Sequence, residues 1–194
     1  MPTISPDRLE RICTDLLTAA GATEDEARIV GRGLVWANLT GCDSHGVMRL
    51  PQYVAAIEKG VIVPGASTEV VRESPTTAVL DAHWGFGQVA ATRATEMAIA
   101  KARQSALAAV SGRRSNHVGA LADYVEMIAG EGLVGLMFVN GHGGGNNTVP
   151  FGGADARLCT NPMAAGFPTE SEPIVLDIST AAVAEGKVLS LIHI

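Results

Sequence analysis

The sequence has few cysteines, a low share of charged residues and no long hydrophobic run, and these shortages exclude several classes of protein. Its three cysteines, Cys13, Cys42 and Cys159, are odd in number and far apart, so neither a disulfide framework nor a zinc-binding motif is indicated. No apolar run approaches the ~18 residues that a membrane-spanning helix requires. The formal net charge of −6 gives no electrostatic reason to expect a nucleic-acid partner.

The first residues also lack a basic segment followed by an apolar stretch, so no secretory signal is indicated and we expect a cytoplasmic protein. Hydrophobic residues make up 47% of the 194 residues, and charged residues make up only 18%. This balance supplies enough apolar side chains for a large buried core and argues against disorder. The length suits one domain, or one domain and a fraction of another.

Residues 1–76 are predicted to form a mainly helical segment. Pro6 is a suitable first helical residue, and apolar side chains then recur at helical spacing. Residues 23–26 form a capping box that starts a second helix. Pro51 starts a third helix, which Gly60 ends.

From residue 77 to residue 188 strands and helices alternate, which predicts a layered α/β core with a mixed sheet. The expected strands and helices occupy residues 78–81, 88–104, 107–110, 121–130, 133–139 and 174–178. The nearly continuous apolar run of residues 133–139 is typical of a strand that is covered on both faces, and residues 174–178 form a second such run.

A glycine-rich stretch over residues 140–147 directly follows one expected strand. It does not match the Rossmann dinucleotide-binding fingerprint, because its third glycine is out of place and the loop continues where a helix should begin. We therefore predict a non-Rossmann α/β fold. Two interpretations of the stretch stay open, a loop that exposes its backbone near a phosphate group and a plain surface loop.

Three short motifs combine residue types that suit chemistry on a small carboxylic acid. Residues 43–49, Asp-Ser-His-Gly-Val-Met-Arg, bring a hydroxyl, an imidazole and a guanidinium close together. Histidine transfers protons near neutral pH, and arginine binds a carboxylate through two parallel hydrogen bonds. A second motif, Ser-Asn-His-Val-Gly-Ala, occupies residues 115–120, and a third, Val-Leu-Asp-Ile-Ser-Thr, occupies residues 175–180 ahead of Gly186 and Lys187.

Together and in this order, the motifs resemble the malate/L-lactate dehydrogenase family, whose members do not have a Rossmann fold. The resemblance extends from about Leu9 to about Val188 and includes Asn140, Gly141 and the run Cys-Thr-Asn-Pro at 159–162. It implies an oxidoreductase that transfers a hydride between NAD or NADP and a small 2-hydroxy or 2-oxo acid, such as malate or lactate. It also implies a homodimer in the full-length protein.

The resemblance implies catalytic roles for four residues. His45 is assigned as the proton donor, with Ser44 beside it in the proton relay. Without the resemblance, a cap or a buried hydrogen-bonding residue is the simpler interpretation of His45. His117 is the rival proton donor, and we expect it to begin the next helix, whose N-terminus favours a neutral imidazole. Lys187 is assigned to polarising the carbonyl oxygen of the substrate.

Substrate-binding residues are assigned in the same way. Arg49 follows His45 by one turn if the segment is helical and would bind the substrate carboxylate, whereas a solvated arginine or an internal ion pair is the alternative. Tyr53 would either line the same pocket or pack in the core. Further substrate contacts are expected at Asp177, Ile178 and Ser179. Asp177 has the alternative of capping a helix or a turn.

The residues expected to contact the cofactor come from the second motif and from the region that follows it. They are His117, Val118, Gly119, Ala120, Leu121, Asn140, Thr160 and Asn161. No two histidines stand at metal-ligand spacing with a carboxylate partner, so we predict no metal site.

Residues 189–194 match nothing that we associate with the family, whose members are considerably longer than 194 residues. We therefore expect an α/β core that is incomplete at its C-terminus, an aberrant tail and little activity in this form. Apolar surface that further elements would cover should cause self-association. The alternative to an enzyme is a non-catalytic ligand-binding or oligomerisation module.

Overall fold

The computed structural model describes residues 3–141 and 146–182. Contacts between residues divide the chain into two compact units, Met1–Ala120 and Leu121–Ile194. The first unit includes the helices expected over residues 1–76 together with the first strands and the long helix of the α/β region. Lys187, the centre of the glycine-rich stretch and the tail at 189–194 lie outside the described residues.

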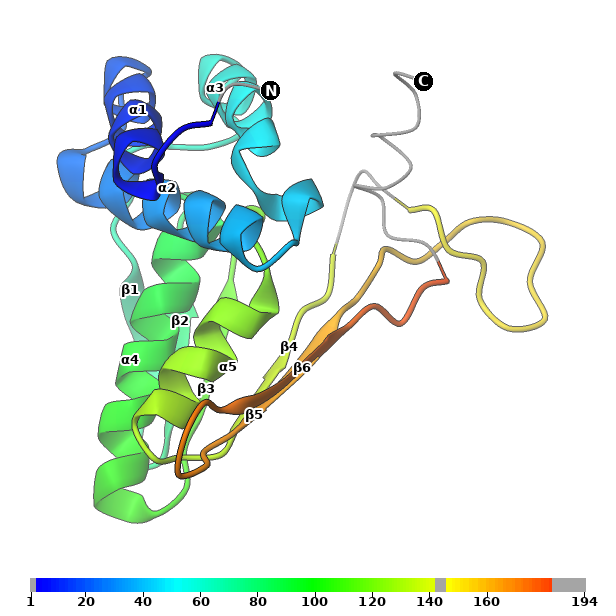
Figure 1. Cartoon of the computed structure of the whole chain (residues 1–194). Coiled ribbons are helices and arrows are strands. Elements are labelled where there is room, and N and C mark those ends of the chain that lie inside the picture. The colour runs from blue at the N-terminus through cyan, green and yellow to red at the C-terminus, as the bar shows by residue number, and fades with distance from the viewer. Residues whose placement is uncertain (1–2, 142–145, 183–194) are drawn as a thin grey trace. The chain divides into compact units, whose positions relative to one another are not determined.

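Two helices that lie side by side open the first unit (Figure 1). They are α1 (Pro6–Ala19) and α2 (Glu24–Leu39). The predicted capping box is confirmed, because the Glu26 N–H donates to Thr23 Oγ1 at 3.3 Å and the Thr23 N–H donates to the Glu26 carboxylate at 2.9 Å. Local sequence signals therefore set where both helices begin.

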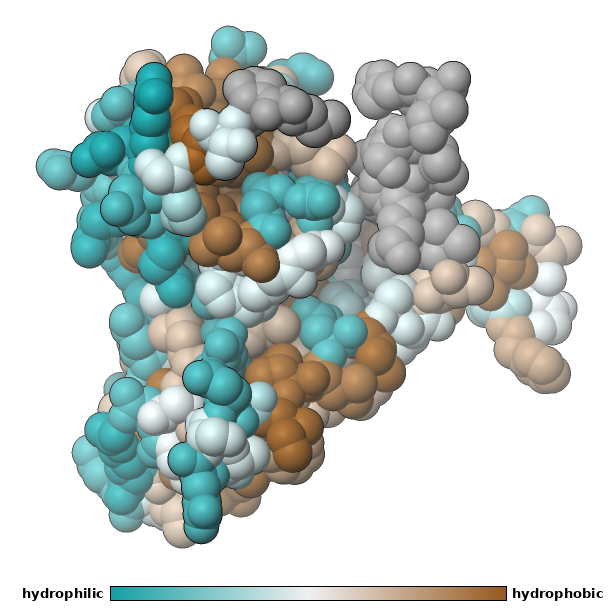
Figure 2. All heavy atoms as spheres, viewed as in Figure 1, coloured by the Kyte–Doolittle hydropathy of each residue, from teal (hydrophilic) through white to brown (hydrophobic). Residues whose placement is uncertain are grey.

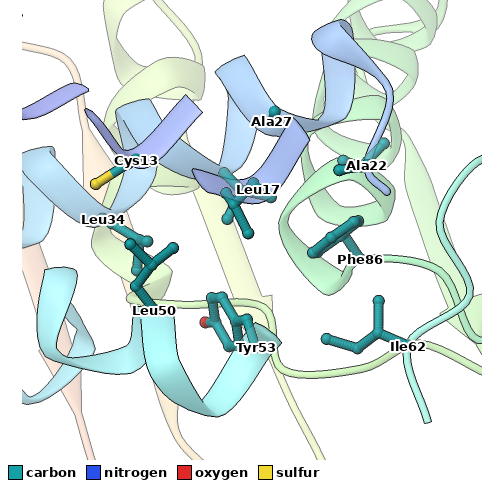
Figure 3. Close-up of a cluster of buried hydrophobic side chains, with 11 residues drawn as sticks. Cys13, Leu17, Ala22, Ala27, Leu34, Leu50, Tyr53, Ile62 and Phe86 are labelled. Atoms are coloured by element: carbon teal, nitrogen blue, oxygen red, sulfur yellow. The ribbon is translucent and has the colours of Figure 1, made fainter. Parts of the chain in front are cut away.

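Two short 3₁₀ turns, η1 (Asp43–His45) and η2 (Val47–Arg49), lead into the helix α3 (Leu50–Glu58). α3 begins one residue before the proline that was expected to start it. Side chains from these helices and from the following segments form a buried apolar cluster, and burial of this cluster holds α3 in place. Figure 3 labels nine of its members, Cys13, Leu17, Ala22, Ala27, Leu34, Leu50, Tyr53, Ile62 and Phe86.

A three-stranded mixed sheet completes the first unit. Its strands are β1 (Glu69–Glu73), β2 (Thr77–Asp81) and β3 (Ala109–Arg113). β1 and β2 pair antiparallel, whereas β2 and β3 pair in parallel. The helix α4 (Gly87–Ser105) connects the parallel pair, as a parallel connection requires. The predicted α/β class with a mixed sheet is confirmed, although β3 begins two residues later than the strand expected from residue 107.

Among its described residues, the second unit has one helix and a separate antiparallel sheet. The helix is α5 (Leu121–Gly130), and the strands are β4 (Gly135–Phe138), β5 (Met163–Phe167) and β6 (Ile174–Ile178). The strands are hydrogen-bonded in the order β4-β5-β6, and they form the long twisted ribbon in Figure 1. α5 packs against all three strands, with Leu121, Tyr124 and Val125 on its buried face, as expected.

The expectation that β4 and β6 are covered on both faces is wrong for the residues that the structure describes. Leu136, Phe138 and Ile174 are 61%, 67% and 65% exposed. The physical reason is that the sheet of this unit is antiparallel and packs against a single described helix, which covers one face only. Hydrophobic side chains are consequently visible at the surface in Figure 2.

Candidate active site

The first motif folds into two 3₁₀ turns, so the condition that the segment between His45 and Arg49 is α-helical is not met. Gly46 separates η1 from η2 and has an extended backbone. A Cβ atom on Gly46 would lie 2.3 Å from Asn38 Oδ1, the oxygen that accepts a hydrogen bond from the Val47 N–H. Any larger residue would therefore displace Asn38 and release the second turn.

His45 is half-buried, and two neighbouring side chains approach the same nitrogen of its ring. Ser44 Oγ lies 3.0 Å and Cys42 Sγ lies 3.4 Å from His45 Nδ1. Ser44 and His45 are thus within hydrogen-bond distance, as a proton relay requires. Both of these contacts engage Nδ1 of the ring.

His117 lies beside His45, although the two residues are far apart in the sequence. Their rings stack with centroids 5.4 Å apart and an interplanar angle of 26°. His117 Nδ1 is also 2.7 Å from the hydroxyl oxygen of Tyr53. Desolvation by the surrounding protein lowers the pKa of His117 to about 3, and the positive charges of Arg49 and His45 act in the same direction. His117 is an exposed residue in the structure, which moderates the desolvation, yet the neutral imidazole remains the form favoured at neutral pH.

The expectation that His117 begins a helix is wrong. α5 starts at Leu121, and residues 115–120 have no regular secondary structure. The low pKa of His117 is therefore explained by its packing and by neighbouring positive charge, and a helix N-terminus is not needed to explain it.

Arg49 is buried, with only 7% of its surface exposed. Its Nε donates to the Ser44 carbonyl oxygen at 2.6 Å, and its Nη1 donates to Gln52 Oε1 at 2.8 Å. Both acceptors are neutral oxygens, and none of the ion pairs between described residues includes Arg49. The alternative of an internal ion pair thus has no support among these residues. The guanidinium is a buried positive charge that acts on the imidazole of His117.

Tyr53 belongs to the apolar core and to the site at once. It is 3% exposed and packs in the buried cluster, while its hydroxyl contacts His117. The same hydroxyl accepts a hydrogen bond of 2.7 Å from Nε2 of Gln88. Burial raises the pKa of Tyr53 to about 12, so the phenol keeps its proton. Sequence reasoning missed Gln88, because a single glutamine in an alanine-rich helix carries no motif.

The first residue of α4 and the second motif are packed backbone against backbone. A Cβ atom on Gly87 would lie 2.2 Å from the carbonyl oxygens of Asn116 and His117, closer than any real contact allows. The Asn116 side chain secures the same segment by donating to the carbonyl oxygens of Val61, Trp84 and Gly85. These contacts position His117 relative to the start of α4.

In the second unit, two of the expected substrate residues, Asp177 and Ser179, contact backbone groups of the same unit. Asp177 Oδ2 accepts a hydrogen bond of 2.9 Å from the Ala122 N–H, so this carboxylate caps the first turn of α5. Ser179 Oγ forms a turn with Ala181, and Ile178 is 42% exposed. The cap that was the alternative interpretation of Asp177 is therefore present in the structure.

The residues expected to contact the cofactor fall into both units. Val118, Gly119 and Ala120 follow His117 in the first unit, and Gly119 has a positive φ of 81°. Leu121, Asn140, Thr160 and Asn161 belong to the second unit. Asn161 Oδ1 accepts a hydrogen bond from the Gly141 N–H, next to Asn140, and the Thr180 hydroxyl donates to the carbonyl oxygens of Thr160 and Asn161.

The structure thus brings five predicted residues together within the first unit, Ser44, His45, Arg49, Tyr53 and His117. Within the described part of the chain, no group of three or more His, Cys, Asp or Glu side chains is arranged to hold a metal ion. No described helix combines the length and the hydrophobicity that crossing a bilayer requires.

Comparison with known proteins gives a consistent result along the chain. The family model for malate/L-lactate dehydrogenase matches residues 4–192. The chain is 39% identical over 184 residues to the malate dehydrogenase of Pyrococcus abyssi, a match that covers 95% of this chain and 50% of that protein. It is 35% identical over 190 residues to the L-sulfolactate dehydrogenase of Methanocaldococcus jannaschii, covering 98% of this chain and 54% of that protein.

Solved structures agree with this result. The malate dehydrogenase of Pyrococcus horikoshii OT3 matches with a TM-score of 0.92 at 37% sequence identity, covering 96% of this chain and 53% of that one. The chain spans about half the length of the relatives it matches. The family match also runs to residue 192, past the position near 188 where the resemblance was expected to end. These dehydrogenase relatives do not favour the alternative of a non-catalytic module.

Proposed function

Because the chain belongs to the malate/L-lactate dehydrogenase family, we propose that it works in a nicotinamide-dependent oxidoreductase that interconverts a small 2-hydroxy acid and its 2-oxo acid. The single observation that carries the proposal is the buried guanidinium of Arg49, whose charge acts on His117, the ring that stacks on His45. A positive charge removed from water without a counter-ion among the described residues costs free energy, which a bound anion offsets. The carboxylate of malate, lactate or their oxo forms is an anion of this kind.

The contacts of Arg49 indicate how such a carboxylate would bind. Nε is engaged by the Ser44 carbonyl, and one Nη1 hydrogen is engaged by Gln52. A carboxylate would therefore approach the end of the guanidinium and accept hydrogen bonds from the two Nη atoms. Lysine offers no such pair of parallel donors.

We assign the proton donor to His45, with Ser44 beside it in the relay. The low pKa of His117 supports this choice, because an imidazole with a pKa of about 3 has no extra proton to give at neutral pH. When a 2-oxo acid is reduced, His45 would protonate the carbonyl oxygen while Arg49 holds the carboxylate. Lys187 would polarise the same oxygen, and Asp177, Ile178 and Ser179 would contribute further substrate contacts.

The cofactor that we propose is NAD or NADP, which supplies the hydride when it is bound. The residues present fit that requirement in their chemistry, since they provide a proton and a carboxylate site but no side chain that can carry a hydride. His117, Val118, Gly119, Ala120, Leu121, Asn140, Thr160 and Asn161 are the residues that we propose hold it. A cytoplasmic homodimer acting on a small acid, without nucleic-acid or membrane partners, completes the proposal.

The proposal is tested by following the consumption of NADH and of NADPH with a panel of acceptors. Oxaloacetate, pyruvate and a cyclic imine are offered to the 194-residue chain and to a version extended to the length of its relatives. We expect the extended version to consume one of the cofactors with a 2-oxo acid, and the 194-residue chain to be far less active. No consumption with any acceptor by the folded, extended version would refute the proposal.

A further inference from the structure

Gln88 is a buried polar residue to which none of the sequence motifs gives a function. It is 4% exposed and is the second residue of α4. Its Nε2 donates to the hydroxyl of Tyr53 at 2.7 Å, and that hydroxyl lies 2.7 Å from Nδ1 of His117. A chain of two hydrogen bonds therefore runs from the start of α4 to one of the two imidazole rings of the site.

The donor and the acceptor of each hydrogen bond follow from the number of protons that the three side chains have. A phenol has one proton to donate, and the oxygen of Tyr53 already accepts a hydrogen bond from Gln88. The phenolic proton is consequently directed to His117 Nδ1, which must be the unprotonated ring nitrogen. We propose that Gln88, acting through Tyr53, fixes His117 in the tautomer that carries its proton on Nε2. Gln88 is then a positioning residue of the site.

The surroundings of Tyr53 and His117 favour one tautomer of His117 over a mixture of the two. Tyr53 is 3% exposed, so water does not offer its hydroxyl an easy alternative partner. The raised pKa of Tyr53 and the lowered pKa of His117 keep both groups neutral through the neutral pH range. The side chain of Gln88 is held as well, because the residue is only 4% exposed and its amide donates to Tyr53.

The catalytic consequence rests on the proposed function. A neutral imidazole with its proton on Nε2 donates a hydrogen bond from that nitrogen but accepts no proton there. His117 would therefore polarise the substrate oxygen, and the proton that is transferred would belong to His45. The two stacked histidines would then have different roles, polarisation for His117 and proton transfer for His45. The amide of Gln88 would determine this assignment.

The tautomer is measured directly by ¹⁵N NMR of histidine-labelled protein at pH 7, in solution or, for self-associated protein, on a sedimented sample. The His117→Gln variant identifies the signals of His117 among those of the five histidines. We expect Nδ1 to resonate as an unprotonated nitrogen and Nε2 as a protonated one. A wild-type His117 with its proton on Nδ1 would overturn the proposal, and this measurement needs no substitution of Gln88.

The role of Gln88 is tested by Gln88→Met, which keeps the length of the side chain and removes the donor. We expect a mixture of both His117 tautomers in this variant, because the phenol of Tyr53 is then free to accept or to donate. The matched control is Gln104→Met, at an exposed position of the same helix, which should leave the wild-type spectrum unchanged. An unmixed Nε2–H tautomer in folded Gln88→Met would overturn the proposal.

An activity measurement separates this proposal from the proposed function. In the extended enzyme, Gln88→Met should lower kcat for the 2-oxo acid about tenfold, which corresponds to one hydrogen bond, while KM stays close to that of the wild type. A rise in KM with unchanged kcat would contradict a positioning role. If the tautomer mixes as expected but no version of the protein oxidises NADH or NADPH, the role of Gln88 stands and the proposed function fails.

Discussion

The two units of the chain use their polar side chains in different ways. In the first unit, His117 contacts both His45 and Tyr53 beside a buried apolar cluster, and Arg49 is buried. In the second unit, Asp177 caps a helix from the edge of a sheet with exposed apolar side chains. The difference teaches that the geometry of the candidate site is built within the first unit, whereas the described contacts of the second unit serve its own secondary structure.

The largest effect is expected from His45→Ala, which removes the proposed proton donor from the first unit. Reduction of the 2-oxo acid by the extended enzyme should slow by roughly 10²–10⁴-fold, the usual contribution of a general acid. His83→Ala is the control, because His83 lies in the same unit but contacts Glu69 and Arg114. If steady-state kinetics show the same kcat for both variants, the first unit does not carry the proton transfer in the way we propose.

A smaller effect is expected from Arg49→Lys, which keeps the buried charge but removes the pair of parallel donors. KM for the 2-oxo acid should rise by about 10- to 100-fold, since a charge-assisted hydrogen bond contributes ~1.5–3 kcal/mol. Arg103→Lys, at an exposed position of α4, is the matched control and should leave KM unchanged. If the KM of Arg49→Lys equals that of the wild type, the substrate carboxylate does not bind at Arg49.

Asp177 tests whether the second unit contributes to the site, because this residue is both a helix cap and a proposed substrate contact. Asp177→Ala should lower the free energy of unfolding by ~1 kcal/mol through loss of the cap, as measured by urea denaturation. Asp177→Asn should retain most of that stability, since asparagine caps nearly as well. An unchanged KM in Asp177→Asn would exclude Asp177 from the substrate contacts.

The smallest effect is expected in the pH dependence of stability, because part of the His117 side chain is exposed. The pKa of His117 is about 3 in the folded chain, whereas an unperturbed histidine has a pKa of 6.5. Between these values the unfolded chain binds a proton that the folded chain does not, so stability falls as pH drops from about 6.5 towards about 3. His117→Gln should flatten that part of the curve of unfolding free energy against pH. An unaltered slope would show that His117 titrates normally.

Local signals allowed much of the fold to be predicted from the sequence. Pro6 and the capping box of Thr23 and Glu26 act within one helical turn, so the starts of α1 and α2 could be read directly. Gly46 could not be interpreted in this way, because its effect depends on Asn38 from another element. The burial of β4 was misjudged for a related reason, since an apolar run does not reveal what covers it.

The sequence predicted which residue types make up the candidate site, but it did not predict which of these residues contact one another. The types and spacing of Ser44, His45 and Arg49 suit a site for a small acid, but only the further motifs and the family resemblance turned them into a prediction. The contact between Tyr53 and His117 joins distant parts of the chain, and only the fold brings them together. Gln88 completes that contact without any pattern of its own, so sequence reasoning had no signal with which to find it.

The bare backbone of Gly87 has a consequence for how the core of the first unit can vary. The carbonyl oxygens of Asn116 and His117 occupy the space that a side chain at residue 87 would need. Main-chain atoms have no rotamers. The spacing between the backbone of His117 and the start of α4 therefore does not change when one apolar side chain nearby is substituted by another. Drift in the surrounding core is therefore compatible with a constant spacing between the backbone of His117 and the start of α4, as long as residue 87 has no side chain.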